Sequence, residues 1–149
     1  MLTILWLDDM RDPNKYFDKN AGNSNTFQRN KAYYDNLRQQ YSLNFVWVKN
    51  IEEFISYIMK NGVPEFVSFD HDLGKGLPKG LDCAKWLIDY CNNNGVKMPR
   101  FFVHSANPNG QREINGLLQQ TIKITESDIR KIVRRVVDKL LEESTQRYN

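Results

Sequence analysis

Side chains that can bind a metal or move a proton stand directly after three short apolar segments of this chain. They are Asp8 and Asp9 after residues 2–7, Asp70, His71 and Asp72 after residues 66–69, and His104 and Ser105 after residues 101–103. The chain has only 2 histidines, so chance is a poor explanation for both of them standing at such places. We interpret the three polar groups as parts of one site.

The acids of these groups indicate a cation. Asp8, Asp9 and Asp70 would repel one another at one edge of a sheet unless a positive charge neutralised them. Oxygen ligands that leave coordination positions open to water suit Mg²⁺ or Mn²⁺. The alternative is that one or two of these acids only cap the helices that follow them.

The histidines indicate acid–base chemistry on a phosphate. His71 and His104, on either side of a bound phosphate, could take a proton from the attacking oxygen and donate one to the leaving oxygen. Asp70 and Asp72 complete the predicted catalytic set, with Asp72 orienting or assisting. A structural histidine at a strand end is the competing interpretation.

A phosphate needs donors as well. Backbone N–H groups at a helix start near Gly110 would face it, with contacts from Ser105 and Asn107. Arg112 or Lys75 could add positive charge, although each is equally a solvated surface side chain.

The elements that must hold these residues alternate between strand and helix. Apolar segments predict strands at 2–7, 45–48, 66–69 and 101–103, separated by helical patterns. Such alternation is typical of βαβ units and a parallel sheet, here a flavodoxin- or receiver-like three-layer α/β sandwich. In the order 2-1-3-4 the three strands with polar ends are neighbours, and ligands bind at that edge of the sheet. Residues 122–124 are either a short fifth strand or no strand.

The predicted helices have recognisable ends. Asn50 caps a helix that Gly62 closes. Other helices are expected at 26–41, after Gly80, and from 107 to about 120. Residues 10–25 form a polar loop of unusual length, and long loops are often functional.

The end of the chain reads as a separate amphipathic helix. Thr125 with Asp128 resembles a capping box, and we divide the chain into a domain at 1–122 and a C-terminal helix and tail at 123–149. An apolar stripe follows the cap at Ile129, Ile132, Val133, Val136, Val137, Leu140 and Leu141. This helix packs on the sheet, or it docks a partner or a second copy of the chain. A membrane-surface helix is less favoured because acids dilute its basic face.

Composition and the spacing of the cysteines exclude several classes of protein. With 149 residues, 40% hydrophobic and 26% charged, the chain reads as one ordinary globular domain, and its net charge of +3 does not by itself indicate a nucleic-acid surface. Cys83 and Cys91 are eight residues apart in a predicted helix, about 12 Å along its axis, so a disulfide is excluded. Reduced thiols and the lack of a long apolar span predict a cytoplasmic protein without a membrane anchor.

The pattern of these residues resembles response-regulator receiver domains. The resemblance identifies Asp8 and Asp9 with the metal-binding acid pair, Asp70 with the phospho-acceptor and Ser105 with the small hydroxyl residue. Receiver domains also carry a lysine, usually followed by proline, after a fifth strand, and this chain has no such pair after residues 122–124.

The chain is more similar to the cyclic-phosphate-processing receiver domains. The similar blocks are LWLDDMRDP, FVWVKNIEEF, FVSFDHDLG, GLDCAKWLIDYC and FFVHSANPNG, and the resemblance covers residues 2 to about 118. The resemblance implies a receiver fold that has lost signalling and acts on cyclic phosphates, such as RNA ends with a 2′,3′-cyclic phosphate. It also implies that the site consists of the residues that follow the three strands, namely Asp8, Asp9, Asp70, His71, Asp72, His104 and Ser105. The ITESDIRKIVRRVV tail lies outside it and is similar to short C-terminal helices of phage proteins, which would place the chain in the cytoplasm of a phage host.

Three hypotheses remain open from the sequence. The leading one is a metal-assisted phosphoesterase, a hydrolase acting on a cyclic phosphate at an RNA terminus or in a cyclic nucleotide. The second is a non-catalytic module that binds the same ligand as a sensor or sponge. The third is a receiver that is phosphorylated on Asp70 and signals through its C-terminal helix.

Overall fold

The computed structural model describes residues 1–16 and 25–146. Contacts divide the chain into two compact units, residues 1–117 and residues 118–149, which we describe separately. The strands are β1 (Leu2–Leu7), β2 (Leu43–Val48), β3 (Phe66–Phe69) and β4 (Arg100–Val103). The helices are α1 (Pro13–Tyr16), α2 (Asn25–Gln40), α3 (Ile51–Asn61), α4 (Gly80–Asn94) and α5 (Pro108–Gln146). Of the expected loop at 10–25, residues 17–24 lie outside the described residues.

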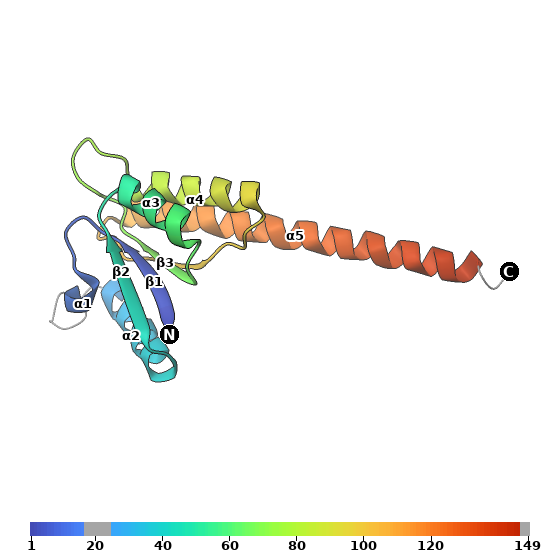
Figure 1. The fold of residues 1–149 in the computed structure, drawn as a ribbon, viewed down its shortest axis with the longest axis horizontal. Helices are drawn as coiled ribbons and strands as arrows, with labels where there is room; N and C mark the ends of the chain where they lie inside the picture. The colour runs from blue at the N-terminus through green and yellow to red at the C-terminus, as the bar shows by residue number, and fades with distance from the viewer. Residues whose placement is uncertain (17–24, 147–149) are drawn as a thin grey trace. The chain divides into compact units, whose positions relative to one another are not determined.

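The four strands form one parallel sheet in the order β2-β1-β3-β4, which confirms the predicted fold class (Figure 1). The register of the strands brings the residues of the site together. Leu7 lies opposite Phe69, and Phe69 lies opposite Val103. Because these three strands end at the same level, the polar residues that follow them emerge side by side at one edge.

Apolar side chains cover both faces of the sheet. One face of the sheet carries Ile4 and Trp6, which pack in one core cluster with Phe27 and Tyr34 of α2. On the other face Phe69 lies 5.9 Å from Phe54 of α3, measured between ring centroids. Because successive side chains of a strand point to opposite faces of the sheet, the strands pack against helices on both faces. Figure 1 shows α3 and α4 on one side of the sheet and α2 on the other.

The helix signals of the sequence are confirmed at both ends of α3. Asn50 is the N-cap of α3 and accepts a hydrogen bond from the Glu53 backbone N–H, and Gly62 is its C-cap. The two cysteines are free and buried, as expected.

The sequence interpretation was wrong about the start of the last helix. Residues 122–124, which we considered as a fifth strand, belong to α5, and α5 continues through Thr125 without a break. No glycine or proline stands between Gly116 and Thr125, so nothing in that stretch interrupts the helix that begins at Pro108.

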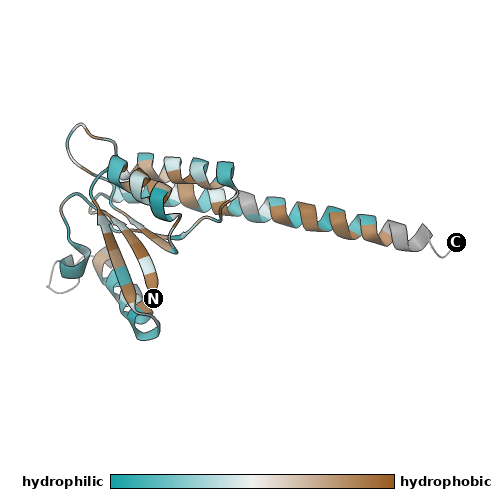
Figure 2. Ribbon diagram, viewed as in Figure 1, coloured by the Kyte–Doolittle hydropathy of each residue, from teal (hydrophilic) through white to brown (hydrophobic). Residues whose placement is uncertain are grey.

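The helical unit 118–149 carries an exposed apolar stripe. Its isoleucine, leucine and valine side chains from Ile129 to Leu141 are each 46% to 60% exposed. Figure 2 shows hydrophobic and hydrophilic residues alternating along this helix. Docking of a partner or of a second copy through this stripe stays a prediction. In the part of the chain that the structure describes, no helix combines the length and apolarity needed to cross a membrane.

A close approach between α4 and β3 depends on Gly80. A Cβ atom on this residue would lie 1.7 Å from the backbone oxygen of Asp70, and the Gly80 N–H donates to the His71 oxygen at 2.8 Å. The start of α4 is thereby held against the strand end that carries Asp70.

We predict that Gly80→Ala lowers the free energy of unfolding by about 1–3 kcal/mol, because the added methyl group forces α4 away from β3. Gly116→Ala is the matched control, since nothing lies within 4 Å of its Cβ position, and it should be neutral or stabilising by up to about 1 kcal/mol. Urea unfolding followed by circular dichroism measures both. Equal effects of the two substitutions would contradict this account of Gly80.

Candidate functional site

A cleft opens at the carboxyl ends of β1 and β3. It has a volume of about 580 Å³ and is lined by Asp8, Asp9, Met10, Arg11, Asp70, Asp72, Gly74 and Lys75. The four acids predicted from the sequence therefore do come together in one place. Two cations, Arg11 and Lys75, share the cleft with them.

The Arg11 guanidinium joins the two most buried acids. Its Nε lies 2.6 Å from Asp8 Oδ2, and its Nη2 lies 2.6 Å from Asp70 Oδ2. Its Nη1 also donates to the backbone oxygen of His104 at 3.3 Å. A planar group with donors in a fixed fork is suited to such a bridge between two carboxylates. The residues after β1, β3 and β4 are thus tied together by one side chain.

Asp8 is fully buried and fully hydrogen-bonded. Its Oδ1 accepts from the backbone N–H groups of Met10 and Arg11 at 2.9 and 2.7 Å. Its Oδ2 accepts from Arg11 and from His104 Nε2, the latter at 3.0 Å. Burial alone would raise the pKa of Asp8, but the hydrogen bonds from His104 and the backbone outweigh it and lower the pKa. Asp8 is therefore an ionised, immobilised carboxylate.

His104 lies beneath the cleft rather than in it. Its side chain is fully buried and its ring stacks on Trp6 at 3.8 Å between centroids. Nδ1 is 2.8 Å from Ser68 Oγ, while Nε2 faces Asp8. Because an ionised carboxylate only accepts hydrogen bonds, Nε2 carries the proton and Nδ1 accepts from Ser68. Both ring nitrogens are occupied, so the geometry favours a positioning role over proton exchange with a ligand.

His71 is also buried, on the side of the cleft that faces the start of α5. Its Nδ1 lies 2.8 Å from Asp72 Oδ1, and Asp72 Oδ2 accepts from Asn107 at 3.1 Å. Nε2 has no hydrogen-bond partner among the described residues, and Glu113 Oε2 at 3.5 Å is the carboxylate facing it. A Cβ on Gly110 would lie 2.2 Å from His71 Cγ, so the ring packs directly on that glycine.

The residues predicted to bind phosphate hold the start of α5 together. Asn107 Oδ1 accepts from the backbone N–H groups of Asn109 and Gly110 at 3.1 Å each. Ser105 Oγ accepts from the Asn107 N–H at 3.1 Å, and exposed Arg112 donates to Asn109. Of the four, Asn107 is hydrogen-bonded to a residue that lines the cleft, because its Nδ2 donates to Asp72. Lys75, the other basic residue considered, does line it.

Asp9 differs from the other acids of the cleft. It is partly exposed, and burial together with the negative charges of Asp8 and Asp70 raises its pKa. By contrast, the pKa of Asp72 is lowered by its hydrogen bonds from Asn107 and His71, despite some burial. Asp9 is therefore the acid of the cleft whose pKa is raised, whereas the pKa values of Asp8 and Asp72 are lowered.

Asp8, Asp9 and Asp70 form a cluster that could bind a metal. Each offers one carboxylate oxygen, and these oxygens all lie within 4.8 Å of one another. The donor type is right for a hard cation. The fit fails at Asp8, however, because its two oxygens already accept four hydrogen bonds, which matches the number of lone-pair sites on a carboxylate. A metal could use Asp8 only after Arg11 withdrew.

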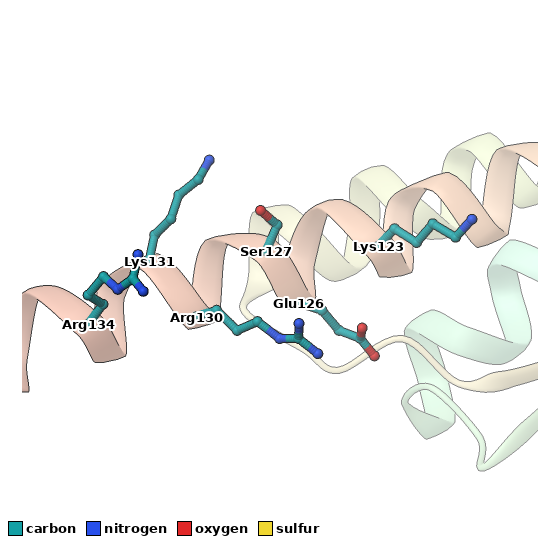
Figure 3. A pocket seen from close by; sticks show the side chains of 6 residues that line it. All are labelled: Lys123, Glu126, Ser127, Arg130, Lys131 and Arg134. Carbon is teal, nitrogen blue, oxygen red and sulfur yellow. The ribbon is translucent and has the colours of Figure 1, made fainter.

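A second hollow lies on the helical unit. It is lined by Lys123, Glu126, Ser127, Arg130, Lys131 and Arg134, and Figure 3 shows that all six side chains come from one helix and spread in different directions. A single convex helix does not surround a ligand, so we assign no site there.

Sequence reasoning missed Arg11 as a site residue, although Arg11 stands in the LWLDDMRDP block. Its backbone N–H closes a turn on Asp8 Oδ1, and an aspartate followed by such a turn brings the third residue on beside its carboxylate. Ser68 was missed because its partner, His104, is 36 residues away.

We predict that the pKa of His104 in the folded protein lies below the ordinary histidine value of about 6.5. Burial lowers its pKa, and the hydrogen bond to Asp8 offsets this only in part. The unfolded chain takes up a proton at His104 near pH 6.5 and the folded chain does not, so this group's contribution to stability is complete above about pH 6.5 and is lost as the pH falls through the folded value. Nitrogen NMR of a His71→Gln variant, which leaves one histidine, measures this. The expected titration midpoint lies below pH 6.5, with the neutral ring protonated on Nε2 above it, whereas a midpoint at or above 6.5 would contradict the prediction.

Comparison with known proteins identifies the family of this chain. A family model described as "Cyclic-phosphate processing Receiver domain" matches residues 3–120. No curated protein is similar enough in sequence to count as a match.

Solved structures show weak overall likeness. One is a yeast Spc42 trimeric coiled coil (amino acids 181–211) fused to another structure, with a TM-score of 0.44 and 12% identity, covering 99% of this chain and 97% of that one. Another is the N-terminal domain of a response regulator/sensory box/GGDEF three-domain protein from Carboxydothermus hydrogenoformans, with a TM-score of 0.38, 14% identity and coverage of 85% and 98%. The family match spans most of the chain and includes every strand-end residue of the cleft, and the protein belongs to the cyclic-phosphate processing receiver domain family.

Proposed function

We propose that this protein hydrolyses a cyclic phosphodiester, at an RNA end or in a cyclic nucleotide, within the cleft at the ends of β1 and β3. The observation that carries the proposal is the placement of Asp9, a partly exposed acid with a raised pKa, beside Arg11 and Lys75 in one cleft. Membership of the cyclic-phosphate processing family supports the choice of substrate class.

In the proposed reaction a water molecule opens the phosphate ring. The water oxygen forms a bond to phosphorus, and one ring P–O ester bond breaks. Asp9 accepts the proton that the water loses and returns it to the released oxygen, which leaves a phosphomonoester. A base acts best when its pKa lies near the working pH. Burial and the neighbouring charges of Asp8 and Asp70 raise the pKa of Asp9 in that direction.

Arg11 and Lys75 are the proposed phosphate contacts. Among the described residues, three of the five N–H groups of Arg11 have partners, namely Asp8, Asp70 and the His104 oxygen. The remaining two are free to bind phosphate oxygens, and Lys75 adds a second positive charge at the rim. No step of this reaction is routed through Mg²⁺ or Mn²⁺.

The two histidines are positioning residues in this proposal. His104 holds Asp8, and His71 holds Asp72. This changes the acid–base roles expected from the sequence, because each histidine is 3% exposed or less. The cleft volume of about 580 Å³ suits a single nucleotide better than a long RNA strand.

The same burial supports a second candidate function. A cleft that is lined by no imidazole among the described residues could bind a cyclic phosphate without breaking it. In that case the protein is a binding module, and the ligand is recovered intact after prolonged incubation.

Incubation with 2′,3′-cyclic mononucleotides, a cyclic-phosphate-ended RNA and cyclic dinucleotides tests the proposal, with products separated by chromatography. We expect wild type to open one class of ring, with Asp9→Asn reducing turnover by about 10²–10⁴-fold. Asp89→Asn, an exposed acid on α4, is the matched control and should leave turnover unchanged. Intact but bound ligand would favour the binding module, and full turnover by Asp9→Asn would rule out the role of Asp9.

A further inference from the structure

We infer that the acidic cluster carries its cation within the polypeptide: the Arg11 guanidinium takes the place of a divalent metal between Asp8 and Asp70, and it excludes Mg²⁺ and Mn²⁺ from Asp8 while it is there. The inference concerns the cation of the cluster and holds whether or not the cleft is catalytic.

The first support is the saturation of Asp8. A metal ligand needs a lone pair directed at the ion, and four donors already use both Asp8 oxygens. Two of these donors belong to Arg11, its backbone N–H and its Nε. A metal that bound Asp8 from the cleft would therefore have to displace the Arg11 side chain.

The second support is that Arg11 is held in place from several directions. Its backbone oxygen accepts from Trp6 Nε1 at 3.0 Å, and its guanidinium carbon lies 5.7 Å from the centre of the Tyr16 ring. Only 31% of its side chain is exposed. Both the backbone and the guanidinium of Arg11 are thus held in place. An arginine that a metal could displace easily would instead be exposed to solvent.

The third support is charge. Asp8 and Asp70 each bring a carboxylate to within 2.6 Å of the same guanidinium. A metal that bound without displacing Arg11 would meet a fixed positive charge at close range, which raises the energy of any cation there. Removal of the Arg11 side chain leaves the three acids without this positive charge. The metal site that the spacing of their oxygens suggests should then form.

Titration of the full-length protein with Mn²⁺, followed by the paramagnetic resonance signal of free Mn²⁺, tests this directly. We expect Arg11→Gln to bind Mn²⁺ at least about tenfold more tightly than wild type, since charge count sets cation affinity. Arg11→Gln/Asp70→Asn should lose that gain. Arg29→Gln, an exposed arginine on α2, is the matched control and should bind as wild type does.

Arg11→Lys serves if Arg11→Gln does not fold. A lysine ammonium is a point charge that cannot form the fork to both carboxylates, so this variant should also bind Mn²⁺ more tightly than wild type, by a smaller factor. The inference is overturned if wild type binds Mn²⁺ as tightly as the Arg11 variants and Asp70→Asn abolishes that binding. Because the readout is metal binding alone, absence of cyclic-phosphate hydrolysis would count against the proposed function and leave this inference standing.

Discussion

The bridge from Arg11 to Asp8 and Asp70 is the interaction on which the site depends. Three strands of a parallel sheet end at the same level, and their register alone would bring several carboxylates together without compensation. One guanidinium, with both carboxylates at 2.6 Å, neutralises the two most buried acids and joins three strand ends. Charges buried without a partner are strongly destabilising. The edge of the sheet can therefore collect acids because the turn after β1 returns an arginine to them.

The two buried histidines hold further carboxylates of the site in place. His104 donates to Asp8 from below and is itself held by Ser68 and Trp6. His71 orients Asp72, which also receives a hydrogen bond from Asn107 at the start of α5. Each imidazole thus fixes one carboxylate, and the carboxylates, Arg11 and Lys75 face the cleft. Histidines with second-layer roles of this kind fix the geometry of the groups that touch a ligand.

The sequence was sufficient for the fold and for the gathering of the four acids, and insufficient for the places of the histidines and for the part played by Arg11. Strand order, the ends of α3 and the gathering of Asp8, Asp9, Asp70 and Asp72 follow from periodicity, capping and the geometry of parallel sheets. The role of Arg11 did not follow, because the same acid pattern is compatible with a metal or with an internal cation. Burial of His104 depends on Trp6 and Ser68 across the sheet, which no local pattern reveals. The continuity of α5 past Thr125 shows that a capping motif does not start a helix where the preceding residues are already helical.

Anomalous X-ray diffraction from wild-type crystals soaked in Mn²⁺ tests the central claim most directly, since it locates the metal and the arginine in one experiment. The predicted result is continuous density for the Arg11 guanidinium between Asp8 and Asp70, with no manganese peak at coordination distance from Asp8. A manganese peak bound by Asp8 and Asp70, with the Arg11 side chain turned away, would contradict it.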